Sequence, residues 1–176
     1  MFLSKQAMVG INVVGGVAVL ASYAYCLVTH PLPSEFWGGV PQGLRPVYTV
    51  NMFLAAAGYL VFTYFLMFRL PIVSEHGAWS GVGTFNMLYV LILLPSALWM
   101  PLTLEMLSSP SVGLWWIIRL TLIAVGVGSV GMLMGLVAVR RRSPSLPHML
   151  AVAGSVPFCI QTAILDALVW PAYFSA

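Results

Sequence analysis

Three ionisable side chains lie inside long apolar stretches of this sequence, where lipid makes a charge costly. They are Glu105, Arg119 and Asp166. Successive membrane helices run in opposite directions, so we expect the three to fall at a similar depth, near the face opposite the N-terminus. Arg119 is then able to form an ion pair with one carboxylate. Such a pair locks helices together or contacts a ligand, and snorkelling of Arg119 to the interface is a further option.

Polar residues also recur at helical spacing. The fifth apolar stretch carries Ser155, Cys159, Thr162 and Asp166 at intervals of four, three and four residues. In an α-helix this spacing places them on one face, with Gln161 on a neighbouring face. The third stretch has a similar stripe of Ser96, Trp99 and Thr103. Such stripes indicate either helix packing or the polar lining of an intramembrane pocket.

No pattern typical of a catalytic or metal site is present. The sequence has no His-x-x-x-His, Glu-x-x-His or Cys-x-x-Cys motif. We therefore assign no catalytic and no metal-binding residues, and an enzyme is the less favoured reading. A sterol-isomerase type of enzyme, with Glu105 or Asp166 as proton carrier, ranks last because Arg119 would hold a nearby carboxylate in its charged form.

The elements that must position these residues are membrane helices. Of the 176 residues, 61% are hydrophobic and only 6% are charged, against about 25% charged in soluble domains. Five apolar stretches reach the roughly 20 residues needed to cross a bilayer: residues 8–28, 47–68, 85–106, 114–139 and 149–170. The sequence thus predicts an all-α integral membrane protein, a five-transmembrane-helix bundle that forms one domain over residues 1–176 without a soluble domain.

The basic residues predict the orientation of this bundle. One face carries the N-terminus together with Lys5, Arg69, Arg140, Arg141 and Arg142, and the opposite face has Arg45. We expect the N-terminus on the cytoplasmic or equivalent side and the C-terminus on the other. No basic patch with interleaved aromatic residues is present, so nucleic acid is not an expected partner.

A seam of small residues runs along the fourth stretch, at Ala124, Gly128, Gly131 and Gly135. Small residues let two helix backbones approach closely. The seam joins two protomers of a homodimer or packs the bundle itself, and the sequence leaves both alternatives open.

Two motifs resemble a known family. The segment Pro41-Gln-Gly-Leu-Arg-Pro-Val-Tyr-Thr49, followed by Ala-Ala-Ala-Gly-Tyr-Leu-Val61, resembles the start of the second helix in the TspO/translocator-protein (tryptophan-rich sensory protein) family. The segment Leu93-Leu-Pro-Ser-Ala-Leu-Trp-Met-Pro-Leu102 is similar to the third-helix motif of that family. By position, Trp99 matches a family tryptophan. Tyr48 and Phe158 stand in place of tryptophans, and Asp166 stands in place of an asparagine.

The resemblance implies an intramembrane pocket beneath the first loop that accepts flat hydrophobic ligands such as porphyrins or sterols. Aromatic faces stack on planar rings, and an arginine binds a carboxylate group. The residues expected to line this pocket are Trp37, Tyr48, Asn51, Trp99, Arg119, Phe158 and Asp166. The implied function is ligand binding for sensing, transport or turnover; the alternative is a structural accessory subunit of a larger membrane complex.

Overall fold

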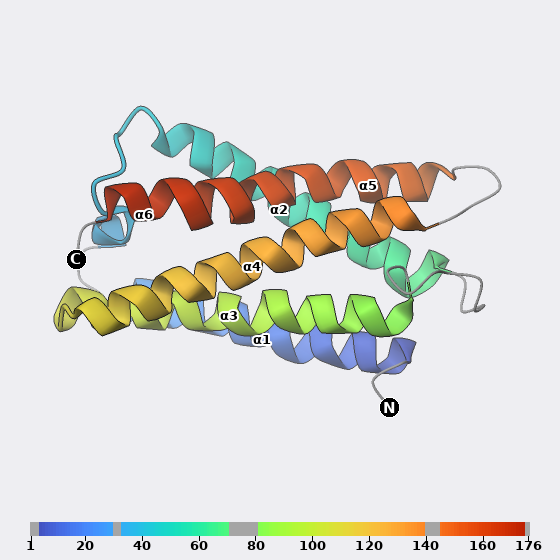
Figure 1. Cartoon of the computed structure of the whole chain (residues 1–176), viewed down its shortest axis with the longest axis horizontal. Coiled ribbons are helices and arrows are strands. Elements are labelled where there is room, and N and C mark those ends of the chain that lie inside the picture. The colour runs from blue at the N-terminus through green and yellow to red at the C-terminus, as the bar shows by residue number, and fades with distance from the viewer. Residues whose placement is uncertain (1–3, 30–32, 71–80, 140–144, 175–176) are drawn as a thin grey trace.

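Five helices dominate the chain, as the sequence predicts (Figure 1). The computed structural model describes residues 4–29, 33–70, 81–139 and 145–174. Each of the five membrane-length helices is long and apolar enough to cross a bilayer. The elements are α1 (Lys5–Thr29), η1 (Pro33–Trp37), α2 (Arg45–Tyr64), η2 (Phe65–Arg69), α3 (Val82–Ser108), α4 (Val112–Ala138), α5 (Leu146–Cys159), η3 (Ile160–Val169) and α6 (Trp170–Tyr173). Of these, η1 is a 3₁₀ turn, whereas η2 and η3 are π-helical continuations of α2 and α5.

Most helix ends lie a few residues beyond the apolar stretches, whereas α4 ends at Ala138, one residue short of the prediction. A helix of 27 residues, such as α3, spans about 40 Å at 1.5 Å per residue, which is longer than the roughly 30 Å hydrocarbon core. The extra turns therefore reach the headgroup region, where polar side chains continue the helix. At the start of α4, the side chain of Ser111 accepts a hydrogen bond from the Leu114 backbone N–H at 3.2 Å. This cap fixes the first turn.

The order of packing is α1 on α3, α3 on α4, α4 on α5 and η3, and α5 on α2. Figure 1 shows the start of α1 and the end of α2 at one end of the molecule, which we call the N-terminal end. The opposite end holds η1 and α6 (Figure 1). Within the described residues, α1 and α2 do not pack along one another. They are joined near the N-terminal end, where the Tyr59 hydroxyl donates to Asn12 Oδ1.

Large side chains fill the N-terminal end. Phe62, Phe65 and Phe85 are fully buried there, in a cluster that we call the N-terminal core. Within this core a hydrogen bond joins the hydroxyl oxygens of Thr63 and Tyr89, which lie 2.8 Å apart. The bond links α2 to α3. This end of the bundle is therefore solidly packed.

Glycines set the closest helix contacts. A Cβ added at Gly58 of α2 would lie 2.0 Å from the Gly154 carbonyl oxygen of α5. In the small-residue seam of α4, a Cβ at Gly128 or Gly131 would lie 2.8 or 2.6 Å from an Ile92 or Leu88 side-chain atom of α3. At Gly128 and Gly131 the seam thus packs α4 against α3 inside one bundle.

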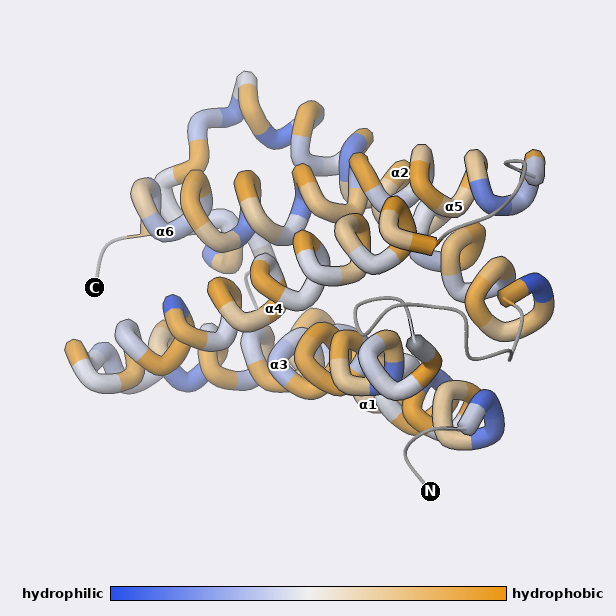
Figure 2. The backbone as a smooth tube through the Cα atoms, turned by 45° about the vertical axis from the view of Figure 1, so that its right-hand side comes forward, coloured by the Kyte–Doolittle hydropathy of each residue, from blue (hydrophilic) through white to orange (hydrophobic). Residues whose placement is uncertain are grey.

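The outer surface is apolar. Figure 2 shows hydrophobic residues along the whole length of the helices rather than on one inner face. Val28, Phe53 and Leu20 are among the large hydrophobic side chains that point outward, with exposed fractions of 85%, 74% and 72%. Lipid is the solvent that such a surface requires. The chain is a multi-pass membrane protein; the predicted anchors Arg140, Arg141 and Arg142 lie outside the described residues.

Candidate ligand site inside the bundle

A chain of three polar side chains crosses the bundle interior between α2 and η3. Asn51 Nδ2 donates to the Pro157 carbonyl oxygen at 3.1 Å and to Gln161 Oε1 at 3.0 Å. Gln161 Nε2 then donates to Asp166 Oδ1 at 2.9 Å. A backbone carbonyl can only accept, so Asn51 must turn its NH₂ group toward Pro157. This orients Gln161, whose carbonyl accepts from Asn51 and whose NH₂ group points at the Asp166 carboxylate.

The π-helical winding of η3 brings Gln161 and Asp166 together. Residues five apart lie above one another when hydrogen bonds run from i to i+5, but they lie on different faces of an α-helix. The expected single stripe from Ser155 to Asp166 does not form one common surface, because Thr162 and Asp166 have different partners. Thr162 instead turns toward α4 and donates to Ser129 Oγ at 2.7 Å.

Asp166 is half-buried and faces the middle of the bundle. Tyr23 of α1 and Tyr48 of α2 both lie within electrostatic range of it. Tyr48 is fixed because its hydroxyl donates to the Leu165 carbonyl oxygen at 2.8 Å. We call the group formed by Tyr23, Tyr48, Asn51, Trp99, Gln161 and Asp166 the inner site.

The two carboxylate oxygens of Asp166 differ in their hydrogen bonding, because only Oδ1 receives the bond from Gln161. Among the described residues, no side chain or backbone group donates a hydrogen bond to Oδ2. Asp166 Oδ2 is not among the fully buried atoms that lack a partner in the described part of the chain.

Aromatic rings surround this carboxylate. The indole N–H of Trp99 donates to the Tyr23 hydroxyl, and the two rings meet edge to face with centroids 5.9 Å apart. The Trp99 ring also contacts Trp170 edge to face at 5.8 Å. On the side of the first loop, Trp37 contacts Tyr48 edge to face at 5.8 Å. These rings therefore form two groups, and each group includes one tyrosine, Tyr23 or Tyr48, that lies near Asp166.

The loop that contains η1 closes the bundle at this end. The Trp170 indole N–H donates to the Phe36 carbonyl oxygen at 2.9 Å, and the Gly39 backbone N–H donates to the Tyr173 carbonyl oxygen at 2.8 Å. Gly38 has φ of 54°, a left-handed conformation that glycine adopts at no steric cost. These contacts tie the loop to α6, so the inner site is covered on its aqueous side.

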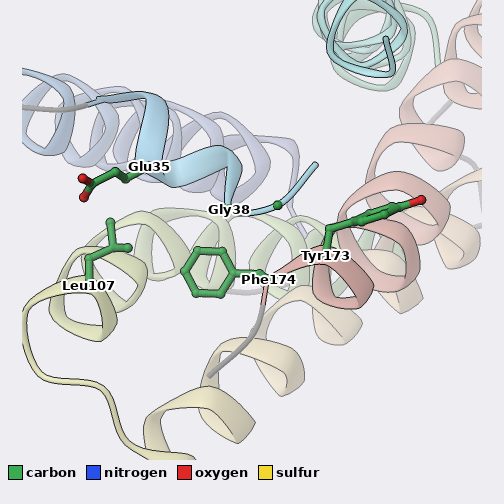
Figure 3. A pocket seen from close by; sticks show the side chains of 6 residues that line it. Glu35, Gly38, Leu107, Tyr173 and Phe174 are labelled. Carbon is green, nitrogen blue, oxygen red and sulfur yellow. The ribbon is translucent and has the colours of Figure 1, made fainter. Parts of the chain in front are cut away.

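A separate shallow hollow of about 320 Å³ lies outside this closure (Figure 3). Its lining residues are Glu35, Gly38, Gly39, Leu107, Tyr173 and Phe174. Figure 3 shows the Glu35 carboxylate and the Tyr173 hydroxyl pointing away from each other. Because its polar groups do not converge, this hollow is a weaker candidate than the inner site.

The structure brings together five of the seven residues that the resemblance implies. Trp37, Tyr48, Asn51, Trp99 and Asp166 lie around the same part of the interior. Their neighbours Tyr23, Gln161 and Trp170 were not among the expected lining residues. For Gln161 a signal was present in the sequence, since an uncharged amide in the middle of an apolar span needs a partner.

Phe158 and Arg119 lie elsewhere. Phe158 contacts the rings of Tyr59 and Phe62 at 5.8 and 5.4 Å, so it belongs to the N-terminal core. Arg119 places its guanidinium beside the Trp115 and Trp116 rings, 5.9 and 5.3 Å from their centroids. These contacts separate both residues from the inner site.

The expected convergence of three ionisable residues is not observed. Among the described residues, no ion pair joins Arg119 to Glu105 or to Asp166. Glu105 is exposed in the last turn of α3, whereas Asp166 is bound by Gln161. The prediction that the three residues meet rested only on their depth in the membrane. Their side chains leave their helices in different directions.

The carboxylate of the inner site is not part of a metal-ligating group in the part of the chain that the structure describes. Within the described residues, no three His, Cys, Asp or Glu side chains are grouped so that they could hold a metal ion. No protein-family model, curated protein or solved structure matches this chain.

Proposed function

We propose that this membrane protein binds a flat hydrophobic ligand, of the porphyrin or sterol class, at the inner site. The aromatic rings of Tyr48 and Trp99 offer faces and edges to a planar ring system. Asp166 offers one polar contact that fixes its orientation. Mostly apolar walls with a few oriented polar groups are the usual composition of a small-molecule site.

The observation that carries this proposal is the hydrogen bonding of Asp166. A carboxylate inside a membrane bundle is costly and usually marks a functional site. Here it has no cationic partner among the described residues, and only one of its oxygens receives a hydrogen bond from them. A purely structural aspartate would be expected to have both oxygens satisfied. The oxygen without a donor supports a role in ligand contact.

Entry from the bilayer is consistent with the packing of the helices. The loop with η1 is tied to α6 and covers the aqueous side. By contrast, α1 packs on α3 and α2 packs on α5, and the described parts of α1 and α2 do not pack along each other. We propose that a hydrophobic ligand already dissolved in lipid enters between these two helices, which suits sensing, transport or turnover of such a ligand.

Tryptophan fluorescence of the protein in lipid nanodiscs tests the proposal. We expect saturable quenching by a porphyrin at micromolar concentration, and competition by a sterol. Trp99→Phe should reduce the amplitude of quenching, because Trp99 lies in the inner site. As a matched control, Trp116→Phe should leave the dissociation constant unchanged, since Trp116 is 55% exposed on the outer surface.

If the protein is instead an accessory subunit of a larger complex, we expect the opposite result. A protein with only a structural role would show no saturable quenching and would migrate with a stoichiometric partner after extraction in mild detergent. That combined result would overturn the proposed ligand-binding function.

A further inference from the structure

The orientation of the polar chain has a consequence for the kind of ligand that fits. Pro157 fixes Asn51, Asn51 fixes Gln161, and Gln161 donates to Asp166 Oδ1. The two side-chain hydrogen bonds, from Asn51 to Gln161 and from Gln161 to Asp166, therefore both run toward the carboxylate. Its last acceptor, Asp166 Oδ2, has no donor among the described residues.

We infer that Asp166 Oδ2 selects ligands that carry a hydrogen-bond donor, an amine or a hydroxyl group, over ligands of the same shape that carry only an acceptor. This inference rests on the proposed function, since it assumes that a ligand enters the inner site. A ligand that brings a donor favours the ionised form of Asp166, and an ionised carboxylate has acceptors only. A ligand ketone or carboxylate placed against it would leave two acceptors facing each other inside the bundle, where an unpaired polar group is costly.

Two neighbouring donors are already used within the protein, so they do not offer a hydrogen bond to a ligand that carries only acceptors. The Trp99 indole N–H is already used by the Tyr23 hydroxyl, and the Tyr48 hydroxyl is used by the Leu165 carbonyl. Arg119, which would bind an acidic ligand, stacks against Trp115 and Trp116 and forms no ion pair with Asp166 among the described residues. The inner site is therefore an acceptor surface within an apolar wall. A hydroxyl- or amine-bearing sterol fits it better than a ligand that presents its carboxylate groups there.

A set of matched sterol probes tests the inference with the protein in nanodiscs. The probes share one four-ring skeleton and carry an amine, a hydroxyl or a ketone at the same carbon. Affinity is measured by competition against a fluorescent sterol. We expect the amine to bind at least about tenfold more tightly than the ketone, with the hydroxyl between them, because hydrogen bonds to charged groups are the strong ones.

Asp166→Asn gives the sharper result, because the preference should invert. Gln161 keeps its NH₂ group on position 166, so the new asparagine must accept there with its oxygen. Its own NH₂ group then points into the interior in place of Oδ2. This variant should bind the ketone severalfold more tightly than the amine. Ser129→Ala removes a polar group on α4 outside the inner site and should leave the wild-type order unchanged.

Adding Asn51→Ala to Asp166→Asn tests the relay. Without Asn51, the Gln161 amide can turn over, and the inverted preference should shrink toward equal binding.

The outcomes separate the two claims. If no probe binds in the wild type, the proposed function fails. If all probes bind with equal affinity, or if the wild type prefers the ketone, a ligand site exists but Asp166 does not select donors there. The wild-type series alone decides this, so the inference stays testable even if a variant does not fold.

Discussion

Replacing Gly58 with alanine tests the helix contact that positions the inner site. Gly58 and Gly154 mark the crossing of α2 and α5, and Asn51 and Gln161 lie seven residues away from them along the same two helices. The hydrogen bond between Asn51 and Gln161 therefore depends on how closely these backbones approach.

The size of the effect follows from the distances. An added Cβ at Gly58 would lie 2.0 Å from the Gly154 carbonyl oxygen, whereas ordinary contact begins at 3.4 Å. The backbones would have to separate by the difference, about 1.4 Å. A Cβ at Gly154 would lie 2.9 Å from Gly58 Cα, which requires about 0.5 Å. Overpacking costs about 1–3 kcal/mol, so we expect about 3 kcal/mol for Gly58→Ala and about 1 kcal/mol for Gly154→Ala.

Gly16→Ala is the matched control, because nothing lies within 4 Å of a Cβ at that position of α1. Its free energy of unfolding should stay within about 0.5 kcal/mol of the wild type. The assay is reversible unfolding in mixed micelles with increasing denaturing detergent, followed by circular dichroism. The reasoning would be refuted if Gly58→Ala were as stable as Gly16→Ala.

Three further results are expected. Trp170→Phe loses the bond to the Phe36 carbonyl and should destabilise the protein by about 1 kcal/mol, with faster hydrogen exchange in the loop containing η1. A double-mutant cycle of Ser129→Ala and Thr162→Val should give a coupling of about 0.6 kcal/mol, the average for such bonds between membrane helices; zero coupling would contradict the bond. If the N-terminus is cytoplasmic, Ser109→Cys should react with an impermeant maleimide from outside intact cells, and labelling only after permeabilisation would reverse the orientation.

Apolar length was enough to predict the fold. Each of the five stretches exceeds the length of a membrane span, and lipid leaves the backbone no alternative to satisfying its hydrogen bonds internally. The structure confirms five such helices and adds a few residues at most of their ends. The packing partner of the small-residue seam in α4 could not be predicted. Small residues allow close helix contacts both within one protomer and between two protomers, and the sequence pattern is the same in both cases.

The inner site was predicted only in part. Tyr48, Asn51, Trp99 and Asp166 were expected together, and they lie together. The link from Gln161 to Asp166 was missed because it depends on π-helical winding after Pro157, and no spacing rule for an α-helix pairs residues five apart.

The error at Arg119 has a different cause. Depth in the membrane was read correctly as a constraint, but it says nothing about the direction in which a side chain leaves its helix. Tryptophans one turn earlier in α4, at positions 115 and 116, lie beside the guanidinium group. A cation held over aromatic rings competes with an ion pair, and the sequence places those rings closer than any carboxylate.

Photo-crosslinking with a diazirine sterol tests most directly whether the interior binds a ligand. Labelled residues are mapped by mass spectrometry after reconstitution in nanodiscs, with and without excess unlabelled sterol. The account predicts competed labelling of inward-facing residues around Trp99 and Asp166. Labelling confined to outward residues such as Leu20 and Phe53, and unaffected by competitor, would contradict it.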